Sequence, residues 1–124
     1  MAKSTRSPMA QYFAKSITMA KDRAKRTYFC EFNQEITENF LMDLYASQDG
    51  KCALTGDTME LTRGGNWYGG KNPRGCSIDR IDPSQGYYID NIQLACARWN
   101  TIKGDMTMTQ WRELAQAMAT HLLK

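Results

Sequence analysis

Residues 77–103 read SIDRIDPSQGYYIDNIQLACARWNTIK, and this stretch decides the fold. CSIDRI (76–81) and IQLAC (92–96) have the composition of short strands, although the first departs from strict alternation. DPSQG (82–86) between them is typical of a turn, because proline follows an aspartate and a glycine comes late. ARWNTIK (97–103) then predicts a short helix, so the order is strand, turn, strand, helix.

Helical patterns flank this unit on both sides. Apolar residues at helical spacing predict an amphipathic helix over 9–26, and Thr37 is a good N-cap for a further helix ending at Gly50. Thr107 and Gln110 form a capping box for the last helix. The apolar residues of that helix predict a buried stripe, consisting of Trp111, Leu114, Ala115, Met118 and Leu122.

Two other segments have weaker patterns. TYFCEFN (27–33) fits either a short strand or a connection between helices. Residues 61–75 are rich in Gly, Asn and Pro and predict a long loop. Trp67 and Tyr68 in this loop either stack on nucleic acid, beside Lys71 and Arg74, or anchor the loop to the core.

The chain of 124 residues is long enough for one domain with a single modest core. We expect an α+β fold in which a hairpin and a helix form the centre, with helices on both sides. Residues 1–35 then form a basic helical arm and connection, 36–105 the core region and 106–124 a C-terminal helix.

Positive charge gathers at the N-terminus. Residues 1–26 hold seven Lys or Arg, among them Lys3, and one acid, so their net charge is +6, whereas the remainder carries −3. Such a cluster indicates either a phosphate-backbone partner, DNA, or a merely solubilising helix face. The candidate DNA-binding residues of this segment are Lys21, Arg23, Lys25 and Arg26.

The cysteines and the hydropathy restrict the compartment and the cofactors. None of the four cysteines stands in a C-x-x-C pair, so we expect free thiols and no structural zinc. No apolar run approaches the roughly 20 residues of a membrane span, and the N-terminus does not resemble a signal peptide. We expect a cytoplasmic protein without a membrane partner that is a monomer or a weak dimer.

The central unit contains residues suited to metal and phosphate chemistry. A hairpin packed on a helix can bring Asp79 and Asn100 together, and their oxygens suit Mg²⁺ or Mn²⁺. Arg80 can grip a phosphate with its planar guanidinium, and Lys103 adds positive charge. The alternative is that all of these are solvated charges in a surface loop.

CALTG (52–56), SIDRIDPSQGYYIDNIQLAC (77–96) and NTIK (100–103) together resemble the HNH, or ββα-metal, endonuclease family, in particular its small bacteriophage-encoded members. The resemblance covers roughly residues 48–105. It implies a metal-dependent enzyme that hydrolyses DNA phosphodiester bonds, in the host cytoplasm if the protein is phage-encoded.

The family pattern also implies roles for single residues. Asp79 and Asn100 fall where the family has metal ligands, and Asn91 falls where an Asn orients the connecting loop. Arg80 stands where most members have the general-base His, and a guanidinium cannot accept a proton at physiological pH. A subset of HNH-like proteins also has Arg at this position. The only histidine, His121, lies in the last predicted helix.

Either another base removes the proton of the attacking water, with Tyr87, Lys51 and Tyr88 as the candidates, or the metal lowers the pKa of that water enough. The alternatives are that the tyrosines pack in the loop and that Lys51 is an exposed lysine. The family's structural zinc pairs are incomplete, because Thr55 and Trp99 stand three residues after Cys52 and Cys96. We expect Trp99 to fill the vacated space.

These patterns predict an endonuclease that nicks one strand, since one small metal site cuts one bond. A catalytically inactive HNH-like scaffold, kept as a DNA-binding or phage accessory protein, is the alternative. Asp82 is expected to cap the Asp-Pro turn rather than to bind the metal.

Overall fold

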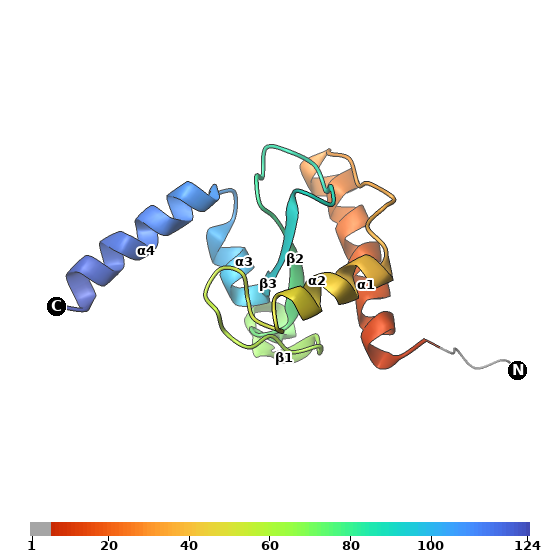
Figure 1. Cartoon of the computed structure of the whole chain (residues 1–124), viewed down its shortest axis with the longest axis horizontal. Coiled ribbons are helices and arrows are strands. Elements are labelled where there is room, and N and C mark those ends of the chain that lie inside the picture. The colour runs from red at the N-terminus through yellow and green to blue at the C-terminus, as the bar shows by residue number, and fades with distance from the viewer. Residues whose placement is uncertain (1–5) are drawn as a thin grey trace, which may run out of the picture.

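The computed structural model describes residues 6–124; Lys3 of the basic segment lies outside them. The fold is mixed α+β, as predicted, with four α-helices and a two-stranded antiparallel sheet among the described residues (Figure 1). In chain order the elements are α1 (Pro8–Arg23), the π-helical turn η1 (Ala24–Tyr28), α2 (Glu38–Ser47), β1 (Gly64–Trp67), the 3₁₀ turn η2 (Tyr68–Gly70), β2 (Cys76–Arg80), β3 (Ile92–Cys96), α3 (Ala97–Lys103) and α4 (Met108–Leu122).

The hairpin of β2 and β3 is the centre of the molecule. Its register pairs Cys76 with Cys96 at one end and Arg80 with Ile92 at the other. α3 begins directly after β3 and folds back against both strands. The predicted order of strand, turn, strand and helix is therefore confirmed for residues 76–103.

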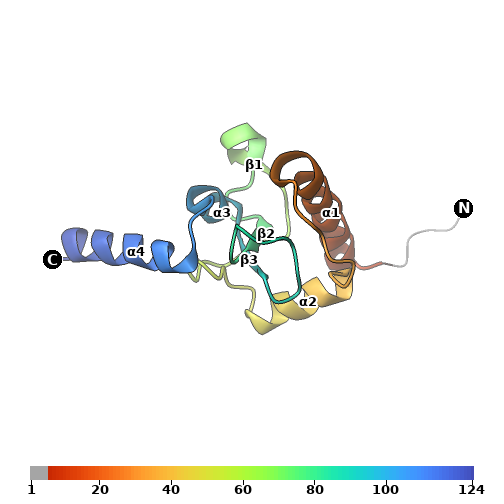
Figure 2. The same cartoon turned by 90° about the horizontal axis from the view of Figure 1, so that it is seen from above.

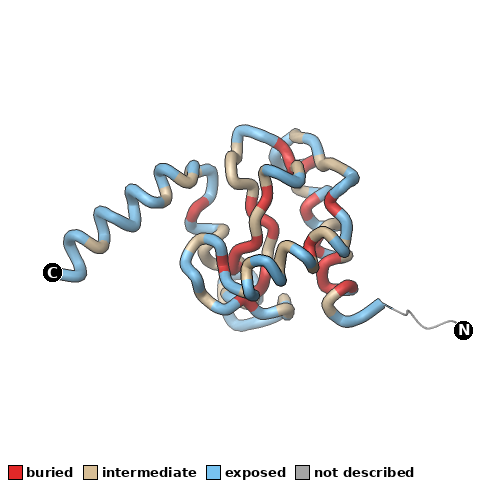
Figure 3. The backbone as a smooth tube through the Cα atoms, in the orientation of Figure 1, coloured by how far each residue is buried: buried red, intermediate tan, exposed pale blue. Residues whose placement is uncertain are grey.

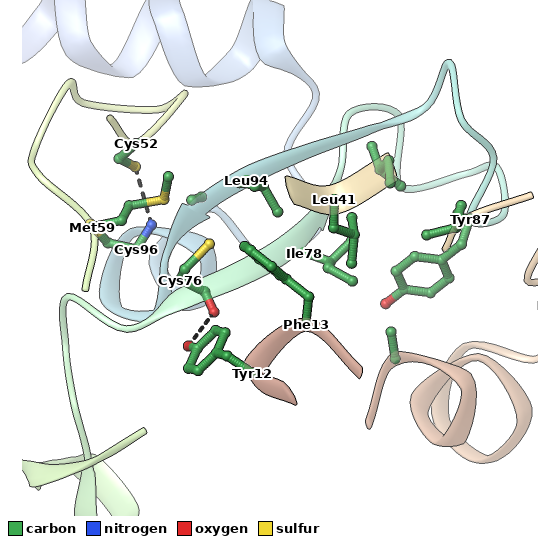
Figure 4. Close-up of a cluster of buried hydrophobic side chains, with 14 of the residues drawn as sticks. Tyr12, Phe13, Leu41, Cys52, Met59, Cys76, Ile78, Tyr87, Leu94 and Cys96 are labelled. Carbon is green, nitrogen blue, oxygen red and sulfur yellow. Dashed lines mark hydrogen bonds between the residues drawn. The ribbon is translucent and has the colours of Figure 1, made fainter. Parts of the chain in front are cut away.

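Helices α1 and α2 cover the hairpin and supply much of the core. Phe13 of α1 and Leu41 of α2 are fully buried beside Ile78 and Leu94 of the strands (Figure 4). The Tyr12 hydroxyl donates a 2.6 Å hydrogen bond to the carbonyl oxygen of Cys76, which fixes α1 to the start of β2. The N-terminal segment thus contributes to the core and is more than a basic arm.

The predicted caps and helix ends are largely confirmed. The Thr37 side chain accepts a hydrogen bond from the backbone N–H of Phe40, and the Thr107 capping box is present. α2 ends at Ser47, three residues before Gly50, which adopts φ +65°. The connection after α1 makes only an isolated bridge, between Phe32 and Tyr87, so it is not a strand.

The predicted buried stripe of the last helix is wrong. Helix α4 projects away from the body (Figures 1 and 2), and most of its length is exposed (Figure 3). Leu114, Met118 and Leu122 are 37%, 49% and 68% exposed, and Ala115 is exposed too. Trp111 alone of the stripe is half-buried, and its indole N–H donates to the Leu54 carbonyl oxygen at 3.0 Å. Helical spacing identifies an apolar face but does not supply an element to cover it.

The helices of the described chain, residues 6–124, include none with the length and apolar character of a membrane span.

Candidate functional site

A small pocket lies where β2, α3 and the end of α1 meet. It has a volume of about 40 Å³ and is lined by Arg23, Tyr28, Ile78, Asp79, Arg80, Pro83, Tyr87, Asn100 and Gly104. Asp79, Arg80 and Asn100, which the sequence assigns to metal and phosphate chemistry, thus lie at one place. We call this the Asp79 pocket.

Asp79 is 4% exposed, and both of its carboxylate oxygens accept hydrogen bonds. Lys103 Nζ donates to Oδ1 at 3.1 Å, and Gln93 Nε2 donates to Oδ2 at 2.9 Å. Burial raises the pKa of the Asp79 carboxyl, while these hydrogen bonds and the charges of Lys103 and Arg80 oppose that rise. The carboxylate is therefore held in a fixed orientation at the edge of the pocket.

Hydrogen bonds from the side-chain nitrogen of Asn100 fix the orientation of its amide group. Its Nδ2 donates to Ser77 Oγ at 2.9 Å and to the Ile78 carbonyl oxygen at 3.2 Å. Since the nitrogen is committed to β2, Oδ1 is the atom left to accept from or to ligate a group in the pocket. The two side chains that carry these oxygens, the Asp79 carboxylate and the Asn100 amide, therefore line the same pocket.

Lys103 is the least expected part of the site. Its side chain is fully buried, and besides Asp79 its ammonium binds the Arg80 carbonyl oxygen at 3.0 Å. We predicted a DNA contact for Lys103, but in this structure its charge lies inside the protein. Its visible role is to bind α3 to β2 through a buried ion pair.

Arg80 is held by two carbonyl oxygens and two aromatic rings. Its Nη1 donates to the carbonyl oxygens of Pro83 and Gln85, each at 3.0 Å. Its guanidinium carbon lies 4.0 Å from the centre of the Tyr28 ring and 5.5 Å from that of Tyr87. A guanidinium has five N–H donors, so others remain for a phosphate oxygen in the pocket.

The proposed general bases lie in different places. Tyr87 lines the Asp79 pocket but is 2% exposed, and burial raises the pKa of its phenol, so it stays protonated near neutrality. Lys51 does not line this pocket, and its ammonium donates to Thr58 Oγ1 at 2.9 Å. Tyr88 binds Glu31 through its hydroxyl, at 2.9 Å.

The connecting loop 81–91 is tied by Asn91. Its Nδ2 donates to the carbonyl oxygens of Asp82 and Gly86, and its Oδ1 accepts from the Asp82 N–H. This agrees with an orienting role. Asp82 caps the turn by accepting from the Ser84 N–H and hydroxyl, as expected, and these bonds lower the pKa of its carboxyl.

The oxygens of the Asp79 pocket fit a hard divalent cation in chemical type. Each carboxylate oxygen of Asp79 has a second lone pair beyond its hydrogen bond, and Asn100 Oδ1 adds a neutral ligand. Two protein ligands suit Mg²⁺, which keeps several waters and a substrate phosphate. Among residues 6–124 no group of three or more His, Cys, Asp or Glu side chains is arranged to hold a metal.

At the opposite end of the hairpin three thiols lie together, and we call Cys52, Cys76 and Cys96 the thiol cluster. All three are buried, and the Cys96 N–H donates to Cys52 Sγ at 3.3 Å (Figure 4). Trp99 packs against the core, as expected, and its indole N–H donates to Asp57 Oδ2 at 2.8 Å. Hydrogen bonds thus join the two segments where the resemblance implied an incomplete zinc site.

The predicted DNA-binding residues are spread over several surfaces. Arg23 and Lys71 line a larger groove beside the Asp79 pocket. Lys21, Lys25, Arg26 and Arg74 are exposed, and Arg26 pairs with Asp22 at 2.6 Å. Trp67 is half-buried and lies against Tyr68, which is 76% exposed.

Sequence reasoning missed Gln93 and Tyr28. Gln93 pairs directly with Asp79 in the hairpin register, so its contact was available from aligning the two strands. Tyr28 reaches Arg80 only because η1 continues α1, and no local pattern signals that.

No protein-family model, curated protein or solved structure matches the chain.

Proposed function

We propose that the chain is a metal-dependent DNA endonuclease of the HNH kind that nicks one strand. The observation that carries this proposal is the convergence of Asp79, Arg80 and Asn100 on one small pocket. These are the residues in which the sequence resembles the family, and they come from two different elements, β2 and α3.

Asp79 and Asn100 would hold the divalent cation, through a carboxylate oxygen and Oδ1. A cation bound there supplies charge stabilisation for the phosphate and acidifies the attacking water. Arg80 would donate to a phosphate oxygen, and its contacts with Tyr28 and the loop carbonyls keep it in place before substrate binds.

Among residues 6–124, the side chains that line the Asp79 pocket supply no ready general base. Arg80 is permanently charged, and Tyr87 is buried and protonated. This supports a reaction in which solvent or a substrate oxygen removes the proton, rather than a side chain.

One observation favours the second candidate, an inactive DNA-binding scaffold. The ammonium of Lys103 already neutralises Asp79 at 3.1 Å inside the protein, so the carboxylate has a cationic partner without any metal. In that case the ion pair is structural and Arg80 serves only to bind phosphate.

Conversion of supercoiled plasmid to open circles, in Mg²⁺ and then in Mn²⁺, separates the two candidates. Asn100→Ala removes one proposed ligand without leaving a buried charge, and Asp79→Ala combined with Lys103→Met removes the other together with its partner. Asp90→Ala, at an exposed acid outside the Asp79 pocket, is the matched control.

The nuclease proposal requires nicking by the wild type and the control, and its loss in both site variants. Binding of DNA by every variant with no nicking by any would establish the scaffold.

A further inference from the structure

A second, larger depression adjoins the Asp79 pocket. It has a volume of about 400 Å³, and Arg23, Tyr28, Asn100 and Gly104 line both cavities. We call it the basic groove. Its lining comes from α1, the segment around β1 and η2, the start of β2, including Cys76, and α3.

The charged side chains that line the basic groove in the described chain are all positive. Arg23, Arg63 and Lys71 line it, and no Asp or Glu of the described residues does. Arg23 also reaches the Asp79 pocket, so it links the two cavities. A polyanion that passes from the basic groove toward the Asp79 pocket would meet Arg63 and Lys71 first, then Arg23 at the junction and Arg80 beyond it, with Asp79, which is paired with Lys103, as the one acid of the described lining.

The groove also offers flat stacking surfaces. The Arg63 guanidinium carbon lies 3.9 Å from the centre of the Tyr12 ring, so one face of the guanidinium covers the tyrosine. Nη2 of Arg63 donates to the Tyr12 carbonyl oxygen and, at 2.9 Å, to Ser16 Oγ, which fixes the plane. Arg63 is partly exposed and lines the groove, and guanidinium planes stack on nucleobases.

The loop that forms the wall of the basic groove opposite α1 is held by close backbone contacts and hydrogen bonds. A Cβ atom on Gly65 would lie 2.7 Å from the Asn72 Cα, so the two sides of this loop touch backbone to backbone. The Asn72 amide then donates to the side chains of Glu60 and Thr62, each at 2.8 Å. The groove is therefore a formed feature that needs no rearrangement of this loop to exist.

The size of the groove limits what can enter. A space of about 400 Å³ lies at the small end of ligand sites, which hold one small molecule, so it can enclose one nucleotide but not a double helix. A single unpaired nucleotide has the size, the anionic charge and the flat base that the groove matches.

We infer that the basic groove binds an unpaired nucleotide of a single DNA strand next to the scissile phosphate, with Lys71 and Arg23 on its phosphates and Arg63 against its base. The position beside the cut rests on the proposed function, whereas the binding itself does not. The substrate would accordingly be single-stranded DNA or a duplex with an unpaired nucleotide.

Binding measured in the presence of a metal chelator tests the groove independently of cleavage. The probes are a fluorescent single-stranded oligonucleotide and the fully paired duplex of the same sequence, followed by anisotropy. Thr101→Trp fills the groove without changing charge, and Thr109→Trp, at an exposed threonine of α4 outside it, is the control. Lys71→Ala removes a groove charge, and Lys15→Ala removes an exposed charge elsewhere on the surface.

We expect the wild type to prefer the single strand, and Thr101→Trp to weaken that binding by about tenfold or more, as loss of base stacking does. Lys71→Ala should weaken it less, and both controls should bind like the wild type. Circular dichroism checks that Thr101→Trp is folded. Unchanged single-strand binding by folded Thr101→Trp, or a preference for duplex, would overturn the inference.

The two proposals fail in different ways. If neither plasmid nor single-stranded DNA is cut in Mg²⁺ or Mn²⁺ but Thr101→Trp still loses single-strand binding, the nuclease proposal falls and the groove stands. If the wild type nicks and Thr101→Trp binds and nicks like it, the groove falls and the nuclease stands.

Discussion

The two ends of the β2–β3 hairpin differ in the charge of their buried side chains. At one end Cys76 and Cys96 pair in a dry, uncharged cluster, and at the other Asp79 lies beside Arg80 and the buried ammonium of Lys103. The distance between them along β2 is only a few residues. The dry end can be stable by packing alone, whereas the charged end is stable only while each charge keeps its partner.

The largest effect is expected from removing one charge of the polar end. Lys103→Met leaves the Asp79 carboxylate buried without its cation, and breaking a buried pair in this way costs about 3–5 kcal/mol. Urea denaturation measures the free energy of unfolding. Replacing both residues, as Asp79→Leu with Lys103→Met, should recover most of the loss. A single variant as stable as the wild type would mean that the charged end does not depend on pairing.

The dry end should respond to alkaline pH instead. Burial, with neighbouring thiols adding to it, raises the pKa of Cys76 from 9.0 to about 12 in the folded protein. A raised folded-state pKa gives stability that is complete below about pH 9 and is lost as the pH rises toward 12, by up to about 1.4 kcal/mol per pH unit for one thiol.

Thermal unfolding followed from neutral pH upward measures this loss, and Cys76→Ala is the comparison. The variant should show a shallower decline above pH 9, although Tyr12, whose pKa burial also raises to about 12, contributes to the same slope. An identical decline in both proteins would remove Cys76 from the explanation.

A smaller effect is expected from the hydrogen bond between α1 and the dry end. Tyr12→Phe leaves the buried carbonyl oxygen of Cys76 without the Tyr12 hydroxyl, which costs about 1–2 kcal/mol. Chemical denaturation gives the value, and Tyr68→Phe, at a hydroxyl on an exposed ring, is the matched control. Equal stability of the two variants would show that the 2.6 Å contact contributes nothing.

The smallest effect is expected from α4, which belongs to neither end. Truncation after Trp111 removes residues that are mostly exposed and keeps the indole contact to Leu54. The free energy of unfolding should change by less than about 1 kcal/mol, since little buried area is lost. A large loss of stability would mean that the exposed apolar face is covered in solution.

Some features of the fold and of the candidate site could be predicted from the sequence, and others could not. The hairpin, α3, the Thr37 cap and the Thr107 capping box were predictable, because short-range spacing and turn chemistry determine them. The convergence of Asp79 and Asn100 was predictable for the same reason. The burial of Lys103 was not, because its side chain can point to solvent or to Asp79 and the packing of α3 decides which. The exposure of α4 was not predictable either, because it depends on what lies opposite the helix.

The basic groove is the clearest example of a feature that local sequence patterns cannot predict. Arg63 and Tyr12 are far apart in the chain, and only the docking of α1 brings them together. No local pattern around Arg63 indicates a stacking plane, since its orientation is set by backbone and hydroxyl groups of another element.

The separations along the chain have a consequence for the order of folding. Every contact of the Asp79 pocket between β2, β3 and α3 falls within residues 76–103, whereas the Tyr12 bond to Cys76 spans 64 residues. Contacts that close short loops form early, and long loops are closed late. We expect the hairpin and α3 to assemble first and α1 to dock afterwards, so that during refolding Asp79 and Asn100, the proposed metal ligands, meet before the groove exists.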